Sequence, residues 1–410
     1  MAGPSSHSRS LLTIIFLTVF IDLLGLGIVL PLLPYYAHQF HASGIAVGAL
    51  IGVYSAMQFL TAPLWGRWSD RIGRRPVILL SLAGSTLSYL LFAAADGIGL
   101  LFVSRILAGV AGASIPVAQA YIADVTTDSE RARGMGLIGA AFGLGFVFGP
   151  AIGGLLAHYG HRAPGLAATV ICGLNLIAAF WRLPESLPAE HRHARPAAHP
   201  LLQWRVASRR PQVATLVLLF ATVVFCFSTM ETTLSLLCAT AYGMRAAHIY
   251  WLFGFMGVMT TLMQGGVVGR LAQRMDESRL VSIGTALLGV GLFAAPFTPP
   301  VTPLLVALAA IACGQGIASP LLSSLLSKAS EGKERGEVLG VSQSMGSLAR
   351  ILGPLWGGLL FDRAGPAGPY VTTAAAMGVA TGVAWSLARR RRAAQSAAAD
   401  IAAAPEPPVV

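Results

Sequence analysis

Long apolar stretches alternate along the chain with short polar or basic connections. Each stretch is close to the ~20 residues that an α-helix needs to cross a hydrocarbon core ~30 Å thick. Glycine and proline are frequent inside them, which membrane helices tolerate. The pattern predicts an all-α integral membrane protein with twelve spanning helices. They are expected near residues 11–35, 45–65, 76–95, 98–122, 134–158, 164–182, 213–240, 248–268, 279–297, 302–325, 337–360 and 368–388.

The second half of the chain repeats the first at an offset of 204 residues. The segment 130–156 returns as 334–360, and its glycine-rich part, which begins at Gly149, begins again at Gly353. Two homologous apolar halves are typical of a duplicated transporter whose site lies where the halves meet. We therefore expect two six-helix halves related by a pseudo-two-fold axis.

The longest polar connection follows the sixth predicted span and marks the junction of the halves. This connection, 183–212, is rich in His, Arg and Pro, and we expect it to be a cytoplasmic linker. The N-terminal six-helix half is expected over 1–182 and the C-terminal half over 213–392. Residues 393–410 are rich in Ala and Pro without apolar periodicity, so they are expected to form a disordered cytoplasmic tail.

Composition excludes a soluble protein, because 55% of the residues are hydrophobic and only 11% are charged, against about 25% charged in soluble domains. The formal net charge is +11, and the basic residues gather in loops on one side of the predicted topology. Only Arg162, Arg245 and Arg363 fall in loops on the other side. The positive-inside rule then places both termini in the cytoplasm, with the chain in a bacterial inner membrane. No nucleic-acid partner is needed to explain the charge.

The sequence offers no chemistry for an enzyme. Its cysteines, Cys172, Cys226, Cys238 and Cys313, lie inside apolar spans without the spacing of a zinc site or a disulfide framework. It contains no G-x-x-x-x-G-K-[ST] nucleotide-binding loop, and no nucleophile–base set is recognisable. We expect no cofactor, no metal and no enzymatic activity, with an ion or substrate gradient supplying the energy.

Four segments carry recognisable motifs. They are Ile21 through Pro34 in the first span, Gly66 through Arg75 between spans two and three, Arg105 with Gly109 in the fourth, and Gly145 through Gly154 in the fifth. Together they resemble the major facilitator superfamily; the first is similar to its tetracycline-efflux group and the last to its antiporter motif. Two further segments, Ala120 through Asp124 and Leu183 through Ser186, are also similar to the tetracycline-efflux group. The resemblance implies a drug:proton antiporter. The chain departs from the tetracycline exporters at Ser88, where they carry an acid, and over 281–293, which holds no acid.

Asp22 is the most informative single residue, because it lies ~16 Å along the first span, near the middle of the membrane. A carboxylate there costs ~2.5–3.5 kcal/mol on insertion scales, so we expect a reversible proton carrier. The alternative is a protonated or hydrogen-bonded carboxyl that only packs.

Arg105 lies inside span four and needs an anion, a carbonyl or water. The resemblance implies a part in proton transfer, and a structural ion pair is the alternative.

Two further charges lie inside spans of the second half. Glu231 falls ~27 Å along span seven, where a second proton site, a contact for a cationic substrate and a wetted carboxylate all remain open. Arg350 lies ~20 Å into span eleven, and it must face another helix or the cavity. A substrate-anion contact and pairing with Glu231 or Asp22 are both open for it.

The expected proton-coupling residues are Asp22, Arg105 and Glu231. The expected substrate cavity includes Asp22, Gln58, Gln119, Glu231, Gln315 and Arg350, although interhelical hydrogen bonds are the commoner fate of such amides.

The motif between spans two and three is expected to act as a gate. Its glycines allow a tight cytoplasmic turn, and Asp70 can interact with the positive end of a helix in the other half. Arg74 or Arg71 is expected to pair with Asp124. The resemblance implies that this cluster latches the outward-facing state, whereas positive-inside topology alone explains the arginines but not Asp70. The second half carries Gln273 instead, so the latch should be one-sided. The expected gating residues are Gly66, Asp70, Arg71, Gly73, Arg74 and Asp124.

The glycine-rich motif of span five is expected to bend and thin that helix, so that it packs closely at the interface between the halves. The residues concerned are Gly145, Gly149, Pro150, Gly153 and Gly154.

These observations predict a secondary transporter that exports amphipathic, drug-like compounds, with tetracycline-like compounds among the candidates, in exchange for protons by alternating access. Its expected partners are a small-molecule substrate, protons and the lipid bilayer, and we expect a monomer. A metabolite or sugar transporter of the same fold, importing or exporting, is an alternative. A non-transporting membrane sensor is another, and its mark would be a lost intramembrane acid or a large soluble insertion.

Overall fold

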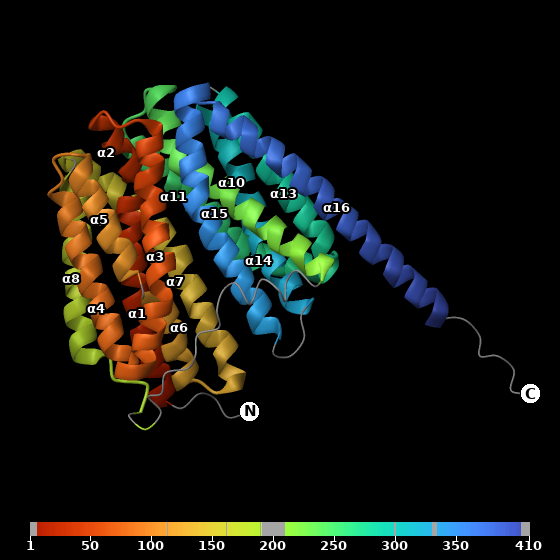
Figure 1. Ribbon diagram of the computed structural model, residues 1–410, viewed down its shortest axis with the longest axis horizontal. Helices are drawn as coiled ribbons and strands as arrows, with labels where there is room; N and C mark the ends of the chain where they lie inside the picture. The colour runs from red at the N-terminus through yellow and green to blue at the C-terminus, as the bar shows by residue number, and fades with distance from the viewer. Residues whose placement is uncertain are drawn as a thin grey trace, which may run out of the picture.

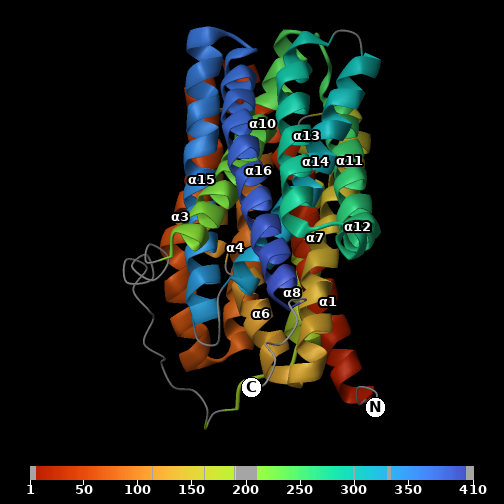
Figure 2. The same ribbon diagram turned by 90° about the vertical axis from the view of Figure 1, so that its right-hand side faces the viewer.

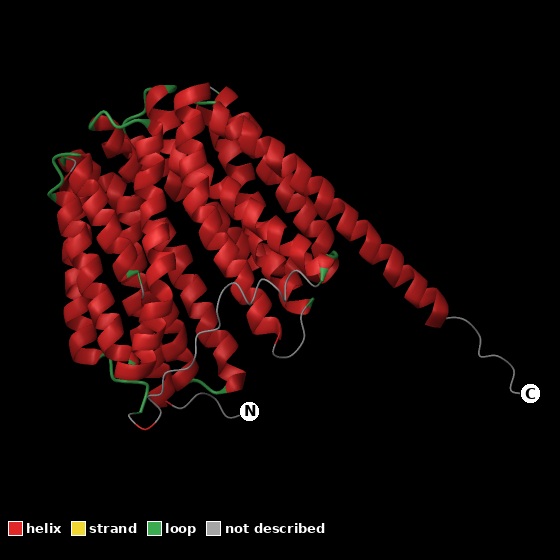
Figure 3. Ribbon diagram, viewed as in Figure 1, coloured by secondary structure: helices red, strands yellow, loops and turns green. Residues whose placement is uncertain are grey.

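A computed structural model describes residues 6–112, 114–160, 162–188, 190, 210–298, 301–329 and 334–402. In these parts of the chain the structure consists of helices joined by short turns (Figure 3), which confirms the predicted all-α class. The helices of the first half are α1 (Ser6–Val29), η1 (Leu30–Leu32), α2 (Leu33–Gln39), α3 (Gly44–Ile72), α4 (Arg74–Ala93), α5 (Ile98–Ala111), α6 (Ser114–Val125), α7 (Asp128–Leu156), η2 (Ala157–Tyr159) and α8 (Arg162–Arg182). Those of the second are α10 (Pro211–Thr240), α11 (Ala246–Leu262), the π-helix η4 (Met263–Val267), α12 (Val268–Arg274), α13 (Glu277–Ala294), η5 (Ala295–Phe297), α14 (Val301–Lys328), α15 (Glu334–Ala364) and α16 (Gly368–Ala402).

The predicted spans agree closely with the helices. Among the described residues, eleven helical segments are long and apolar enough to cross a membrane, and each overlaps one predicted span. The remaining predicted span, 337–360, lies within α15. That helix is less apolar, because polar residues such as Gln343 and Arg350 interrupt it.

Three spans are broken in ways that hydropathy does not reveal. The first contains the turn η1, which places Pro31 near its start, where its missing N–H is tolerated. The fourth is divided at Gly112 into α5 and α6. The eighth contains the π-helix η4, which widens the helix beside Gly265. The fourth-span break bears on function, because it leaves backbone carbonyls of α5 available to side chains of α3.

The C-terminal region differs from the prediction of disorder. Helix α16 continues to Ala402, well beyond the predicted tail boundary at 393. Alanine is the best helix former, and the run of alanines after Arg392 explains the extension. Residues 403–410 lie outside the described residues, as do 191–209 of the predicted linker.

The two halves meet along two helix pairs, α3 with α15 and α7 with α11. Their ribbons lie together at the end that carries α2 and diverge toward the end that carries the N-terminus (Figures 1 and 2). At the first end, the Ser235 hydroxyl donates to the Pro31 carbonyl at 2.8 Å. These residues are separated by the 204-residue repeat offset, so this contact lies close to the expected pseudo-two-fold axis.

Candidate functional site

A small cavity opens inside the first half, between α1, α3, α4 and the α5/α6 break. Asp22 of α1 reaches its wall and is partly exposed. The Gln58 side chain lies beside it and donates from Nε2 to the Gly112 carbonyl at 3.1 Å. The broken helix therefore orients a polar group toward the cavity. The lining residues are Asp22, Leu23, Leu26, Tyr54, Gln58, Ser85, Tyr89, Ala108, Gly112 and Ile115.

Arg105 is buried behind this cavity, with 1% of its surface exposed. One terminal nitrogen donates to the Ser104 hydroxyl at 3.2 Å, and the guanidinium lies 5.8 Å from the centre of the Phe92 ring. Its Nε has no hydrogen-bond partner among the described residues. Tyr54 and Tyr89 are close enough for the charges of both Asp22 and Arg105 to act on them. The two phenols thus connect the predicted proton carrier with the buried cation.

The charges of the second half approach the same region. Arg350 is partly buried on α15 and lies within electrostatic range of Glu231 on α10. The charge of Arg350 also interacts electrostatically with the Tyr54 hydroxyl, across the interface between the halves. Of the open pairings for Arg350, the structure favours Glu231. Tyr54 therefore belongs to both charge groups.

The structure collects only part of the predicted substrate cavity in this one space. Asp22 and Gln58 line it, whereas Gln119 is exposed on α6 and does not. Gln315 lies on α14, and its Oε1 has no partner among the described residues. Glu231 and Arg350 also lie outside the lining.

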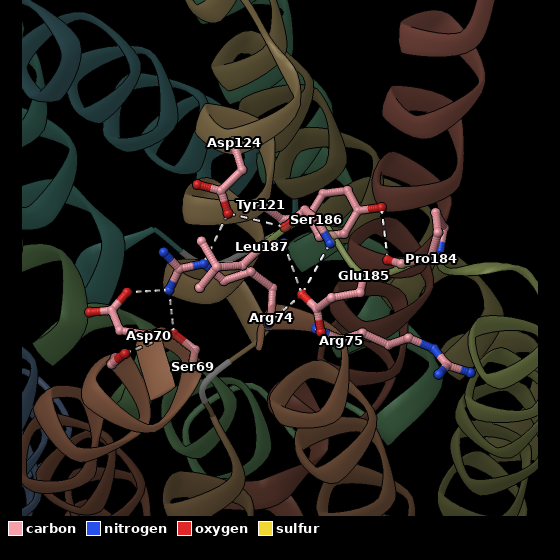
Figure 4. A network of polar contacts seen from close by, with 11 residues as sticks. Ser69, Asp70, Arg74, Arg75, Tyr121, Asp124, Pro184, Glu185, Ser186 and Leu187 are labelled. Atoms are coloured by element: carbon pink, nitrogen blue, oxygen red, sulfur yellow. Dashed lines mark hydrogen bonds and ion pairs between the residues drawn. The ribbon is translucent and has the colours of Figure 1, made fainter. Parts of the chain in front are cut away.

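Three of the six predicted gating residues, Asp70, Arg74 and Asp124, meet in a network centred on Arg74 at the start of α4 (Figure 4). Its Nη1 lies 2.6 Å from Asp70 Oδ1 and donates to the Ser69 hydroxyl at 2.7 Å. Its Nε lies 3.1 Å from Asp124 Oδ2, which also accepts from the Ser186 hydroxyl at 3.1 Å. The network joins the ends of α3, α4 and α6 to the chain after α8.

One detail of the predicted gate needs correction. Helix α3 continues to Ile72, so Gly66 is helical and has open space around it instead of forming a tight turn. The turn is made by Gly73 alone, with φ of +105°. Of the two arginines that the prediction left open as partners of Asp124, Arg74 makes the pair and Arg71 is exposed. The motif alone did not show where α3 ends, because its residue types can all occur inside a helix.

Glu185 is a member of this network that the motifs did not single out as a gating residue. Its carboxylate accepts from the Arg74 backbone N–H at 2.8 Å and from the Arg75 N–H at 3.3 Å, so it caps the N-terminus of α4. A Cβ on Gly73 would collide with the Glu185 carboxylate. The available signal was the Leu183-Pro184-Glu185-Ser186 segment, which resembles the tetracycline-efflux group.

The second half contains a related ion pair with exchanged charges. Lys328, the repeat position of Asp124, lies 2.9 Å from an oxygen of Glu277, which lies at the corresponding start of α13. The same carboxylate accepts from the Ser324 hydroxyl at 3.1 Å. The contact between these helix ends is therefore kept in both halves, while Gln273 replaces the Asp70 carboxylate.

The glycines of α7 permit close approach on two sides. A Cβ on Gly149 would lie 2.6 Å from Gly27 of α1, within the same half. Cβ atoms on Gly153 and Gly154 would collide with Tyr250 of α11, in the other half. The Tyr250 hydroxyl donates to the Ile28 carbonyl at 2.9 Å. Part of the motif thus lies at the interface between halves as predicted, and part packs within the first half. Gly145 faces Leu23 of α1, and Pro150 is buried within α7.

Comparison with known proteins accounts for these features together. The chain is 35% identical over 355 residues to the class C tetracycline resistance protein of Escherichia coli, covering 85% of this chain and 89% of that protein. It is 29% identical to Multidrug resistance protein 2 of Bacillus subtilis, covering 88% and 91%. The solved structure of a human organic anion transporter is 26% identical and covers 93% of this chain and 100% of that one, with a TM-score of 0.69.

The fold agrees with more distant structures as well. A bacterial homologue of the human lysosomal transporter Spinster superposes with a TM-score of 0.76 at 16% identity, covering 94% of this chain and 98% of that one. The family model of the Major Facilitator Superfamily matches residues 15–276 and 265–409. This multi-pass membrane protein therefore belongs to the Major Facilitator Superfamily of transporters.

Proposed function

We propose that this protein exports amphipathic, drug-like compounds in exchange for protons, by alternating access. The observation that carries the proposal is Asp22 in the wall of a cavity that Tyr54 and Gln58 also line, where the charges of both Asp22 and the buried Arg105 reach Tyr54. The phenols and the amide offer aromatic surface and hydrogen bonds to a flat, polar-edged compound. Relatives named for tetracycline and multidrug resistance support this cargo class.

In the proposed cycle, Asp22 takes up a proton from outside and releases it to the cytoplasm. The permanent charge of Arg105 favours the deprotonated carboxylate once the cavity faces the cytoplasm, and cargo then exchanges for the proton. Glu231 beside Arg350 is the proposed second proton-coupling group. The Arg74 network gates the cytoplasmic end. The proton gradient supplies about 2.3 kcal/mol per charge for each 100 mV.

The proposed orientation places both termini in the cytoplasm of a bacterium and the α2 end outside. The end that carries Gly73 also carries Arg182 of α8, Arg274 of α12 and the arginine run that begins at Arg389 within α16, whereas Arg162, Arg245 and Arg363 lie at the other. This asymmetry supports the assignment through the positive-inside rule. The protein is proposed to act as a monomer, since each chain contains both halves and its own cavity.

The proposal is tested by drug uptake into inverted vesicles that carry an imposed proton gradient. Asp22→Asn should abolish proton-driven uptake, because the amide cannot carry a proton in exchange. Asp96→Asn is the matched control, since that carboxylate is exposed and pairs with Arg162 away from the cavity. Uptake that persists with Asp22→Asn, or that ignores a collapsed pH gradient, would overturn the mechanism.

Organic anions are a second candidate cargo class. Two cations, Arg105 and Arg350, act on Tyr54 in the cavity wall, and one solved relative is an organic anion transporter. Including cationic dyes, tetracycline and an organic anion in the same panel separates the two classes. If only the organic anion competes for transport, and Arg350→Gln abolishes that competition, organic anions would be favoured as the cargo class.

A further inference from the structure

Asp362 makes a contact that no motif led us to expect. It is the third residue from the end of α15, and its two carboxylate oxygens accept from the backbone N–H groups of Gly44 at 2.7 Å and Ile45 at 2.9 Å. These are the first two N–H groups of α3. The next one, on Ala46, donates to the Ser43 hydroxyl at 3.3 Å. A residue of the second half thus satisfies helix-end donors of the first half, where an anion is favoured.

The surface around this contact brings the two helices unusually close. Gly44, Gly48 and Gly52 form one stripe along α3, and a Cβ on Gly44 would lie 2.7 Å from the Gly358 carbonyl. A Cβ on Gly48 would collide with the Pro354 carbonyl. Small residues at this spacing let helix backbones meet. Asp362 reaches the start of α3 only while this stripe is packed on α15.

The arrangement has a counterpart at the opposite end of the same helix pair. Asp70 is the third residue from the end of α3, as Asp362 is the third from the end of α15. The two helices run antiparallel, so the two acids lie at opposite ends of the pair. In this structure Asp362 is engaged across the halves, while Asp70 pairs with Arg74 inside its own half.

The other helix pair between the halves carries neither acid. The repeat places His158 of η2 where α15 has Asp362, and Gln273 of α12 where α3 has Asp70. His158 Nδ1 lies 3.2 Å from the Gly154 carbonyl of its own half. The duplication therefore supplied equivalent positions at both interfaces. At these positions the α3/α15 pair has Asp362 and Asp70, whereas the α7/α11 pair has His158 and Gln273.

We propose that Asp362 is a positioning residue of the transport cycle, which holds the outer end of the α3/α15 interface closed and releases α3 when that end opens. The inference rests on the proposed alternating access. It assigns to Asp362, in the inward-facing state, the part that Asp70 is expected to take at the cytoplasmic end in the outward-facing state. Because Asp362 is exposed at the helix end, replacing it leaves the packed stripe of glycines intact.

The test measures the opening of the outer end directly. Spin labels on Gly99→Cys and Ala241→Cys, two exposed positions at this end in opposite halves, report its distance distribution in detergent after the native cysteines are replaced. Asp362→Ala should raise the ratio of open to closed molecules about fivefold, the effect of losing a typical helix cap. Asp362→Asn, which keeps one acceptor oxygen but loses the charge, should shift it less. Asp96→Ala, another exposed carboxylate at this end, is the matched control and should leave the ratio unchanged.

An unchanged distance distribution in Asp362→Ala, or an equal shift in Asp96→Ala, would overturn the inference. A lower melting temperature without a change in the open ratio would also overturn it, because a merely structural contact acts in that way. The measurement uses neither cargo nor a proton gradient. If Asp22→Asn fails to stop uptake, only the proposed proton coupling is contradicted. If the spin-label distances do not change in Asp362→Ala, only the role assigned to Asp362 is contradicted.

Discussion

At the scale of single residues, Gly73 is the position where backbone conformation and contact coincide. Its φ of +105° disfavours any side chain, and a Cβ would strike the Glu185 carboxylate that caps α4. Gly73→Ala should lower the free energy of unfolding by ~1–3 kcal/mol, the usual cost of a strained backbone position. Thermal unfolding in detergent measures this loss.

The matched control is Gly66→Ala, because Gly66 is helical with no atom within 4 Å of an added Cβ. This change should leave stability the same or raise it by up to ~1 kcal/mol, since alanine favours a helix over glycine. Equal losses from both variants would mean that the Gly73 turn and its Glu185 contact have no special part in stability.

Tyr54 offers a second residue-scale prediction, because its hydroxyl is the group on which Asp22, Arg105 and Arg350 all act. Tyr54→Phe keeps the aromatic wall and should leave cargo binding nearly unchanged, while proton-driven transport falls roughly three- to tenfold, the effect of one lost hydrogen-bonding group. Parallel binding and uptake assays measure the two effects. Tyr159→Phe, at an 83% exposed residue, is the control, and a loss confined to binding would contradict the assigned role.

The sequence predicted the candidate site unevenly, for physical reasons. Asp22 stood out because a carboxylate deep in an apolar helix is costly wherever it points. Tyr54 and Glu185 did not, since their importance comes from neighbours 30 to 300 residues away in the chain. Helix periodicity says that a residue is buried, but only packing decides which charges surround it.

At the scale of helices, the contact between α1 and α7 depends on Gly149, where an added Cβ would meet the Gly27 backbone at 2.6 Å. Gly149→Ala should destabilise the protein by ~1–3 kcal/mol through overpacking, because backbone cannot move aside as a flexible side chain can. Gly139→Ala, in the same helix with open space around it, should be neutral or slightly stabilising. Unfolding midpoints in detergent compare the pair, and similar losses would argue against close packing at Gly149.

Helix existence was predictable and helix interruption was not. Hydropathy located the spans to within a few residues because the bilayer requires a minimum apolar length. The breaks at η1, at Gly112 and at η4 follow from tertiary packing, since glycine and proline also occur inside unbroken membrane helices such as α7. Composition misjudged residues 393–402, where low hydrophobicity suggested disorder but alanine propensity extends α16.

At the scale of the whole molecule, the placement of charge should fix the orientation in the membrane. Glu190 follows α8 at the basic end of the bundle, and Gly99 lies at the α2 end. A membrane-impermeant maleimide added to intact cells should label Gly99→Cys but not Glu190→Cys. In inverted vesicles the pattern should reverse. The expectation follows from the excess of arginine at the end that carries Glu190, which resists translocation.

The native cysteines set the background for this measurement. Cys172, Cys226 and Cys238 are buried, and Cys313 is partly exposed, so Cys313→Ser is introduced first and the parent should remain unlabelled. Labelling of Glu190→Cys from outside intact cells would invert the topology. The Arg74 network would then lie at the outer end and Asp362 at the cytoplasmic end, and the directions assigned to both gates would exchange. The orientation experiment therefore decides which side each gate closes, independently of whether either carboxylate acts as a latch.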